Sequence, residues 1–156
     1  MEFHEVVTIL APSQRVWDFL WDIEQMITCI PGCETAQVVE IGKRYKAVVG
    51  QKVGPFTLKL PLEIIIKERK APQHLVVVAS GRDNRVSTNV TIELELHLTD
   101  RGSEGTEMTF TTRMNILGKL ATLGHGLIQR KAKEVIAQFA RTIKQHLEEG
   151  EHLAAV

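Results

Sequence analysis

The sequence predicts an α+β fold in which a curled antiparallel sheet of seven strands surrounds one long C-terminal helix. The segment 34–116 alternates polar and apolar residues and is interrupted by turn residues at short intervals, which is typical of an antiparallel meander. The segment 118–149 has no proline and repeats apolar residues at a period near 3.6. One strand and two short helices precede the meander, so the predicted order is strand, two helices, six strands and a long helix.

The N-terminal segment predicts a strand followed by the two short helices. Residues 3–10 are apolar and β-branched enough for a strand, and Ala11-Pro12-Ser13 then provides a break and a helix start. A second short helix is predicted over 23–28, and Pro31-Gly32 ends it. The first helix is indicated by apolar residues at helical spacing, namely Val16, Phe19, Leu20 and Ile23.

Alternation in the meander predicts which side chains face the core. Inward sets are clearest in two strands and comprise Phe56, Leu58, Leu60, Leu62, Ile64 and Ile66, then Val90, Ile92, Leu94, Leu96 and Leu98. A third alternating strand follows over 108–116. The outward set is polar and includes Lys59, Glu63, Glu93, Glu95 and His97. Pro61 has no amide hydrogen to donate, so its strand is predicted to lie at an edge or to be bulged there.

The last predicted element is a helix of seven to eight turns over 118–149, ending at Gly150. A helix of this length must cross the concave face of a curled sheet, and side chains from one layer cannot fill all the space beneath it. We therefore expect a pocket there. Its wall is predicted at the glycine-rich start of the helix, 118–131, whereas 135–147 is predicted to be packed core.

Length and composition indicate one globular domain, residues 1–150, with a short tail, 151–156. The 156 residues are 24% charged and 44% hydrophobic, and 19 basic residues balance 19 acidic ones. This balance gives no reason to expect a nucleic-acid partner. The N-terminus lacks the features of a secretory signal, and no apolar run reaches the length of a membrane span, so a cytoplasmic location is expected.

Neither the cysteines nor the histidines predict a metal site. Cys29 and Cys33 lie in Cys-Ile-Pro-Gly-Cys, where a disulfide would close a very short loop, so free thiols are expected. This turn is either a redox or metal element or the way the helices enter the sheet, and the second interpretation is favoured because no further ligand or activating base is near in sequence. The six histidines show no ligand spacing, so no metal is predicted.

Several local sequences resemble the CoxG family of carbon monoxide dehydrogenase subunits, which belongs to the START-like (SRPBCC) superfamily. They are Ala11-Pro12-Ser13 with Val16-Trp17, the turn 29–34, the hairpin Lys52-Val53-Gly54-Pro55-Phe56, and Gly118-Lys119-Leu120-Ala121 with Leu123-Gly124. The predicted order of elements is also that of the superfamily's helix-grip fold.

The resemblance implies an accessory protein of molybdenum hydroxylase systems such as carbon monoxide dehydrogenase. It implies an apolar cavity for a bound lipid-like molecule such as a quinone, with no covalent cofactor, and it does not imply catalysis. The resemblance also implies a transient contact with the inner face of the membrane. Some relatives carry an extension after the helix that could supply this contact, whereas this sequence stops at Val156.

Inward strand residues and the start of the long helix are the predicted ligand contacts. Gly118, Gly124 and Gly126 fill space poorly and Met114 is adaptable, which favours a pocket wall over plain core. Lys131 either meets a polar headgroup or extends its alkyl stem to water. The predicted ligand-binding residues are Leu60, Leu62, Leu94, Phe110, Met114, Leu120, Leu123, Leu127 and Lys131.

Two other functions are compatible with the sequence. An enzyme of the polyketide cyclase type needs an acid–base residue inside the cavity, and His125 and Tyr45 are the only loose candidates, so no catalytic residue is assigned. A docking or adaptor module is the other, with 129–133 and Arg141 as a modest basic patch that also suits a solvated helix face.

Overall fold

Seven antiparallel strands form one sheet in a computed structural model of the chain, in the spatial order β1-β7-β6-β5-β4-β3-β2. The structure describes the backbone of residues 1–155 and the side chains of residues 1–149. The strands are β1 (Glu2–Ile9), β2 (Cys33–Glu40), β3 (Arg44–Val53), β4 (Phe56–Lys70), β5 (His74–Asp83), β6 (Thr88–Asp100) and β7 (Thr106–Gly118). The helices are α1 (Ser13–Trp21), α2 (Ile23–Thr28) and α3 (His125–Ala155), with short 3-10 segments η1 (Gly102–Glu104) and η2 (Lys119–Leu123).

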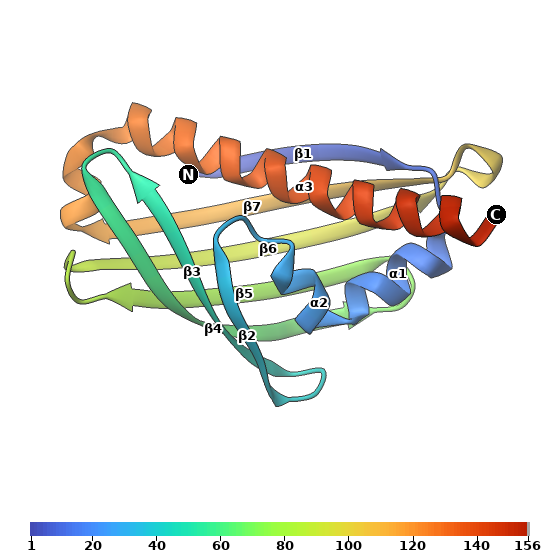
Figure 1. Cartoon of the computed structure of the whole chain (residues 1–156), viewed down its shortest axis with the longest axis horizontal. Helices are drawn as coiled ribbons and strands as arrows, with labels where there is room; N and C mark the ends of the chain where they lie inside the picture. The colour runs from blue at the N-terminus through green and yellow to red at the C-terminus, as the bar shows by residue number, and fades with distance from the viewer. Residues whose placement is uncertain (156) are drawn as a thin grey trace.

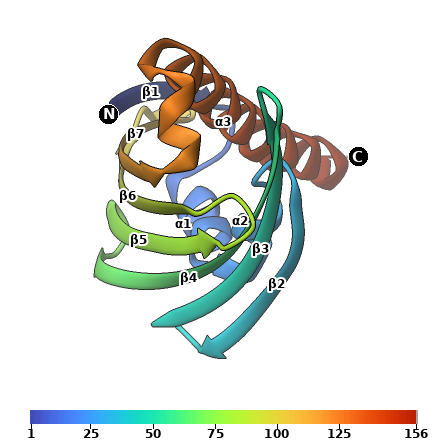
Figure 2. The same cartoon turned by 90° about the vertical axis from the view of Figure 1, so that its left-hand side faces the viewer.

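The sheet curls, and α3 runs across its open side (Figures 1 and 2). The predicted fold class is confirmed, including the two short helices between β1 and β2. The predicted tail, 151–156, lies outside the residues whose side chains are described, and the helix backbone runs as far as Ala155.

The helices α1 and α2 lie under the C-terminal half of α3 (Figure 1). Helix α1 buries the side chains whose spacing predicted it, among them Val16, Phe19 and Leu20. The Phe19 ring lies 4.8 Å from the His146 ring of α3, measured between ring centroids. The Asp22 side chain accepts a hydrogen bond from the Gln25 amide and caps α2. These contacts close one end of the space between sheet and helix.

Strand β4 is an interior strand, so the prediction that Pro61 marks an edge or a bulge at that position was wrong. Its pairing with β5 extends only from Lys70↔His74 to Leu62↔Gly81, and the register shift lies between Ile66 and Glu68. Pro61 therefore falls just outside the β4–β5 ladder, where no amide hydrogen is needed.

The long helix begins at His125 instead of Gly118, because β7 continues to Gly118 and η2 follows it. Gly118 and Gly124 have φ values of +111° and +95°, and these conformations break the helical path on both sides of η2. The Leu120 amide donates a hydrogen bond to Thr88 Oγ1 at 3.0 Å, which fixes η2 against β6. A period near 3.6 continues through this segment, and the sequence pattern therefore concealed the break.

Polar contacts fix the C-terminal half of α3 to the end of β1. Glu148 Oε1 accepts hydrogen bonds from the Leu10 amide at 3.1 Å and from Lys144 Nζ at 2.6 Å. Lys144 Nζ also donates to the Thr8 carbonyl oxygen. The preceding part of α3 packs over the sheet through apolar side chains, among them Ala132 and Ile136.

Candidate ligand-binding cavity

A cavity of about 220 Å³ lies between the concave face of the sheet and α3. Strands β3 to β7 supply its floor and sides, α3 supplies its roof, and Met26, Ile27 and Ile30 close the end beside α2. Lining residues of β4 and β6 belong to the inward sets defined by alternation, namely Leu58, Leu60, Leu62, Ile64, Val90, Ile92 and Leu94. The cavity is therefore a direct product of sheet curvature and alternating side chains.

The walls are apolar almost throughout. Among the described residues that line the cavity, only Gln51, Thr112 and Lys131 carry polar side-chain atoms. Ile92, Leu94, Met114 and Ile116 face inward, yet each is only partly buried. Inward-facing apolar side chains stay partly accessible when no neighbour fills the space beside them, so these four mark the hollow.

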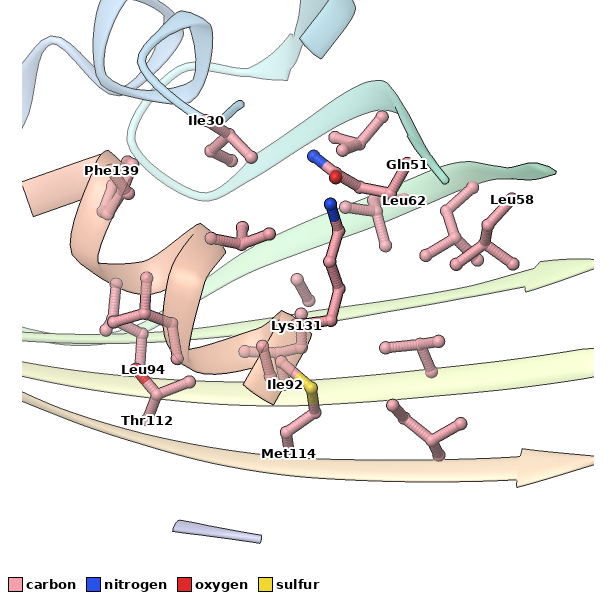
Figure 3. A pocket seen from close by; sticks show the side chains of 18 of the residues that line it. Ile30, Gln51, Leu58, Leu62, Ile92, Leu94, Thr112, Met114, Lys131 and Phe139 are labelled. Carbon is pink, nitrogen blue, oxygen red and sulfur yellow. The ribbon is translucent and has the colours of Figure 1, made fainter. Parts of the chain in front are cut away.

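Lys131 of α3 extends across the cavity, and its amino group points toward the Gln51 side chain of β3 (Figure 3). Gln51 Nε2 donates a hydrogen bond to the Pro31 carbonyl oxygen, so Gln51 Oε1 is left as an acceptor. Within residues 1–149, no hydrogen bond or ion pair forms on the Lys131 ammonium group. The cavity thus combines an apolar body with one cationic donor and one amide acceptor.

Seven of the nine predicted ligand contacts line the cavity. They are Leu60, Leu62, Leu94, Phe110, Met114, Leu120 and Lys131.

The other two, Leu123 and Leu127, lie against the β3–β4 hairpin. A Cβ placed on Gly54 would be 3.3 Å from Leu123 Cδ1 and 4.0 Å from Leu127 Cδ2. The Lys119 ammonium also lies 5.8 Å from the centroid of the Phe56 ring of the same hairpin. These contacts hold the hairpin against η2 and the start of α3. Leu123 and Leu127 therefore lie outside the described cavity lining and connect its β3–β4 wall to its helical roof.

The cavity extends further along α3 than the predicted segment 118–131. Ala132, Val135, Ile136 and Phe139 line it, although 135–147 was predicted to be packed core. Gln51 of β3 was also missed, because β3 lacks the strict alternation of β4 and β6. A helical stripe shows that a face is apolar, and only the shape of the opposite wall decides whether that face meets another side chain or a hollow.

The two loose catalytic candidates are absent from the described cavity walls. Tyr45 is buried, and its hydroxyl oxygen accepts a hydrogen bond from the Gly42 amide at 2.7 Å, so it serves the β2–β3 turn. His125 is exposed at the start of α3. Neither side chain contributes an acid or base to the described hollow.

The two cysteines are free thiols, with Cys29 buried and Cys33 partly buried. Burial raises the pKa of the Cys29 thiol. Burial also raises the pKa of Cys33, with a smaller contribution from Glu34, against the lowering effect of a backbone hydrogen bond of Thr35. Raised pKa values disfavour the reactive thiolate, as the structural interpretation of this turn expects.

Solved structures with the same fold come from several bacteria. A conserved protein from Geobacillus kaustophilus superposes with a TM-score of 0.85 at 23% identity, over 96% of each chain. A protein from Thermus thermophilus gives a TM-score of 0.71 at 18% identity over 99% of each chain. A START superfamily protein from Mycobacterium smegmatis gives 0.72 at 9% identity, over 95% of this chain and 97% of that one.

Further comparisons concern the sequence. Comparison with curated proteins finds no significant match. Among the described residues, no helix is long and apolar enough to cross a membrane. The family model of CoxG, a carbon monoxide dehydrogenase subunit, matches residues 6–148. Since this match covers nearly the whole chain, the chain belongs to the CoxG family of carbon monoxide dehydrogenase subunits.

Proposed function

We propose that this chain is a non-catalytic accessory protein that binds a hydrophobic small molecule, a lipid or a quinone, in the cavity beneath α3. The observation that carries the proposal is the cavity itself, whose described walls are apolar except for three side chains. Transfer of apolar ligand surface from water into such walls is favourable by roughly 25 cal/mol per Å². An apolar ligand would also restore the contacts that the partly accessible inward residues lack.

The shape of the cavity restricts the ligand. Its volume of about 220 Å³ is smaller than the ~300–1,000 Å³ of typical ligand pockets, so it suits a compact ring or one segment of a chain. The polar end of the ligand would lie beside Lys131, whose ammonium donates to a carbonyl or acidic oxygen. A ligand hydroxyl would instead donate to Gln51 Oε1.

The proposed partner is a carbon monoxide dehydrogenase-like molybdenum hydroxylase, as the name of the family suggests. The protein would act in the cytoplasm and load its lipid-like ligand by transient contact with the inner face of the membrane. Equal numbers of basic and acidic residues, 19 of each, give no support to a nucleic-acid role.

A cyclase-type enzyme and a ligand-free adaptor are the alternatives that an experiment must separate. The only ionisable group in the described cavity walls is Lys131, so an acid–base pair for cyclisation would have to come from elsewhere. This absence of a paired group supports binding over catalysis. An adaptor would leave the cavity without a use.

Native mass spectrometry of the purified full chain, followed by extraction with organic solvent, tests the proposal. We expect a stoichiometric apolar molecule that carries an oxygen-containing polar end. Lys131→Met keeps the alkyl stem and removes the charge, so it should weaken binding of that molecule by about tenfold, the equivalent of one hydrogen bond to a charged group. Lys133→Met, an exposed lysine on the same helix, is the matched control and should bind normally.

Three outcomes contradict parts of the proposal. A chain without ligand, which also fails to bind added quinone or lipid, would favour an adaptor. Equal binding by both lysine variants would remove Lys131 from the site. Chemical turnover of an added polyketide would establish an enzyme.

A further inference from the structure

Three potential metal ligands meet on the outer face of the sheet, opposite the cavity. His74 of β5 is paired directly with His97 of β6 in the antiparallel register, and Glu95 precedes His97 by two residues on the same face. Leu94 and Leu96 alternate with them on the inward face, and Leu94 lines the cavity. The sequence shows no ligand spacing here because Glu95 follows His74 by 21 residues, and only strand pairing brings them together.

The three side chains are already arranged around one point. His74 Nε2 and His97 Nε2 each lie 3.2 Å from Glu95 Oε1. One ligand atom from each residue lies within 4.8 Å of the other two. A tetrahedral metal with bonds of about 2.0–2.1 Å separates its ligand atoms by about 3.3–3.4 Å. Two of the three separations thus match a metal site, and the third, between the two histidine nitrogens, is at most 4.8 Å, so the exposed His97 side chain would move toward His74 when the metal binds.

Without a metal, the same contacts are hydrogen bonds. A carboxylate only accepts hydrogen bonds, and Glu95 Oε1 faces the Nε2 atoms of both histidines. Both imidazoles must therefore carry a proton on Nε2. The rings stack, with centroids 4.2 Å apart and planes 16° from parallel, so both nitrogens point at the same oxygen.

His74 lies between two carboxylates, which creates a conflict for a neutral ring. Its Nε2 faces Glu95, while its Nδ1 lies 3.8 Å from Glu68 Oε1 of β4. A neutral imidazole has one N–H, so one of the two carboxylates faces a lone pair. A metal bound to Nε2 requires the proton on Nδ1, beside the Glu68 acceptor. At 3.8 Å from Nδ1, Glu68 would need to move closer to act as the outer carboxylate that orients a metal-binding histidine.

The surroundings determine which Glu95 oxygen faces the histidines and which side of the cluster meets water. Arg113 Nη1 lies 3.8 Å from Glu95 Oε2, which leaves Oε1 as the inner ligand atom. Side-chain exposure rises from 16% at His74 to 33% at Glu95 and 53% at His97, so the site is fixed on one side and open to water on the other.

We propose that His74, Glu95 and His97 bind one Zn²⁺ ion, with water completing the coordination. Two imidazoles and one carboxylate suit zinc, and three protein ligands leave an open position. Nickel and copper ions share the preference for imidazole, so the ions that this site suits are divalent first-row transition metals. This site is separate from the cavity, so it stands whether or not the proposed ligand binds there.

Isothermal titration of ZnCl₂ into the tag-free, chelator-treated full chain at near-neutral pH tests the site. We expect one ion per chain and, with Co²⁺ as the probe, the visible absorption of tetrahedral coordination. His97→Ala and Glu95→Gln should each weaken zinc binding by at least about tenfold, because even outer partners cost about 10–100-fold. Glu68→Gln should give a smaller loss, and His4→Ala, which removes an exposed histidine of β1, should give none.

Absence of zinc binding by the unaltered chain would overturn the proposal, as would full binding by His97→Ala. Imidazole NMR of the unaltered chain gives a readout that does not depend on whether variants fold. The Nε2 signals of His74 and His97 should shift together at one equivalent of zinc. A shift confined to His4, His125 or His146 would place the metal elsewhere.

Discussion

Asp83 at the end of β5 accepts a hydrogen bond at Oδ2 from the backbone amide of Lys59 on β4, at 2.8 Å. Asp83 Oδ1 accepts a second bond from the Arg85 amide at 2.9 Å. The β4–β5 ladder stops at Leu62↔Gly81, so a side chain takes over where backbone pairing ends. The Asp83 carboxylate thus joins the end of β5 to the part of β4 that precedes Pro61, where Leu58 and Leu60 line the cavity.

Asp83→Ala should lower the free energy of unfolding by about 2–3 kcal/mol, because it leaves the Lys59 and Arg85 amides without their acceptor. Urea unfolding measures the loss. Asp100→Ala is the matched control, since Asp100 also accepts from a backbone amide, that of Gly102, but is exposed. A similar loss in both variants would contradict a special role for the buried carboxylate.

The same residue predicts a pH dependence of stability. The Lys59 amide, and then the Arg85 amide and charge, hold the pKa of Asp83 below its usual value despite burial. A carboxyl group whose pKa is lower in the folded state than in the unfolded state stabilises the protein at pH values above its unfolded pKa of about 3.9. This stabilisation disappears as the pH falls through the pKa of the folded state. Asp83→Asn should therefore lose less stability than the unaltered chain when the pH is lowered below about 4. Parallel pH profiles would contradict this.

Ala132→Leu should fill part of the cavity and weaken ligand binding while leaving the fold intact. Ala132 lines the cavity from α3, and cavity filling typically adds about 0.5–2 kcal/mol of stability. Thermal unfolding and the amount of ligand retained in native mass spectra measure the two effects. The same substitution at Ala137, outside the cavity walls, should leave ligand retention unchanged. Equal retention in both variants would indicate that the ligand binds elsewhere.

Alanine at Gly118 should destabilise the protein more than alanine at Gly124. Both glycines have positive φ, so both substitutions incur about 1–3 kcal/mol of backbone strain. A Cβ on Gly118 would also clash with the Ser87 carbonyl oxygen, whereas nothing lies within 4 Å of one on Gly124. Urea unfolding of the two variants should therefore differ, and equal losses would show that the β7–η2 junction tolerates displacement.

The thiols of Cys29 and Cys33 should react slowly with an alkylating reagent at neutral pH and quickly after unfolding. Burial raises both pKa values, so little thiolate is present in the folded protein. Mass spectrometry of alkylated protein with and without urea measures the difference. Rapid labelling of the folded chain would favour a redox role for this turn.

Local pattern was sufficient for the sheet and for most of the cavity floor. Alternation in 56–66 and 90–98 identified inward residues such as Leu60, Leu62 and Leu94, because a strand has only two faces. It was insufficient for the start of α3. Apolar residues recur at helical spacing through Leu120 and Leu123, yet positive φ at Gly118 and Gly124 separates them from the helix.

By itself, the sequence determined the order of elements, the curled sheet and long helix, and the apolar character of the concave face, since these follow from periodicity, turn residues and burial of apolar side chains. Only the tertiary structure decided where the concave face stays hollow, which helix residues face that hollow, and that His74 meets His97. Those relations depend on the curvature of the sheet and on strand register, which join residues far apart in the chain.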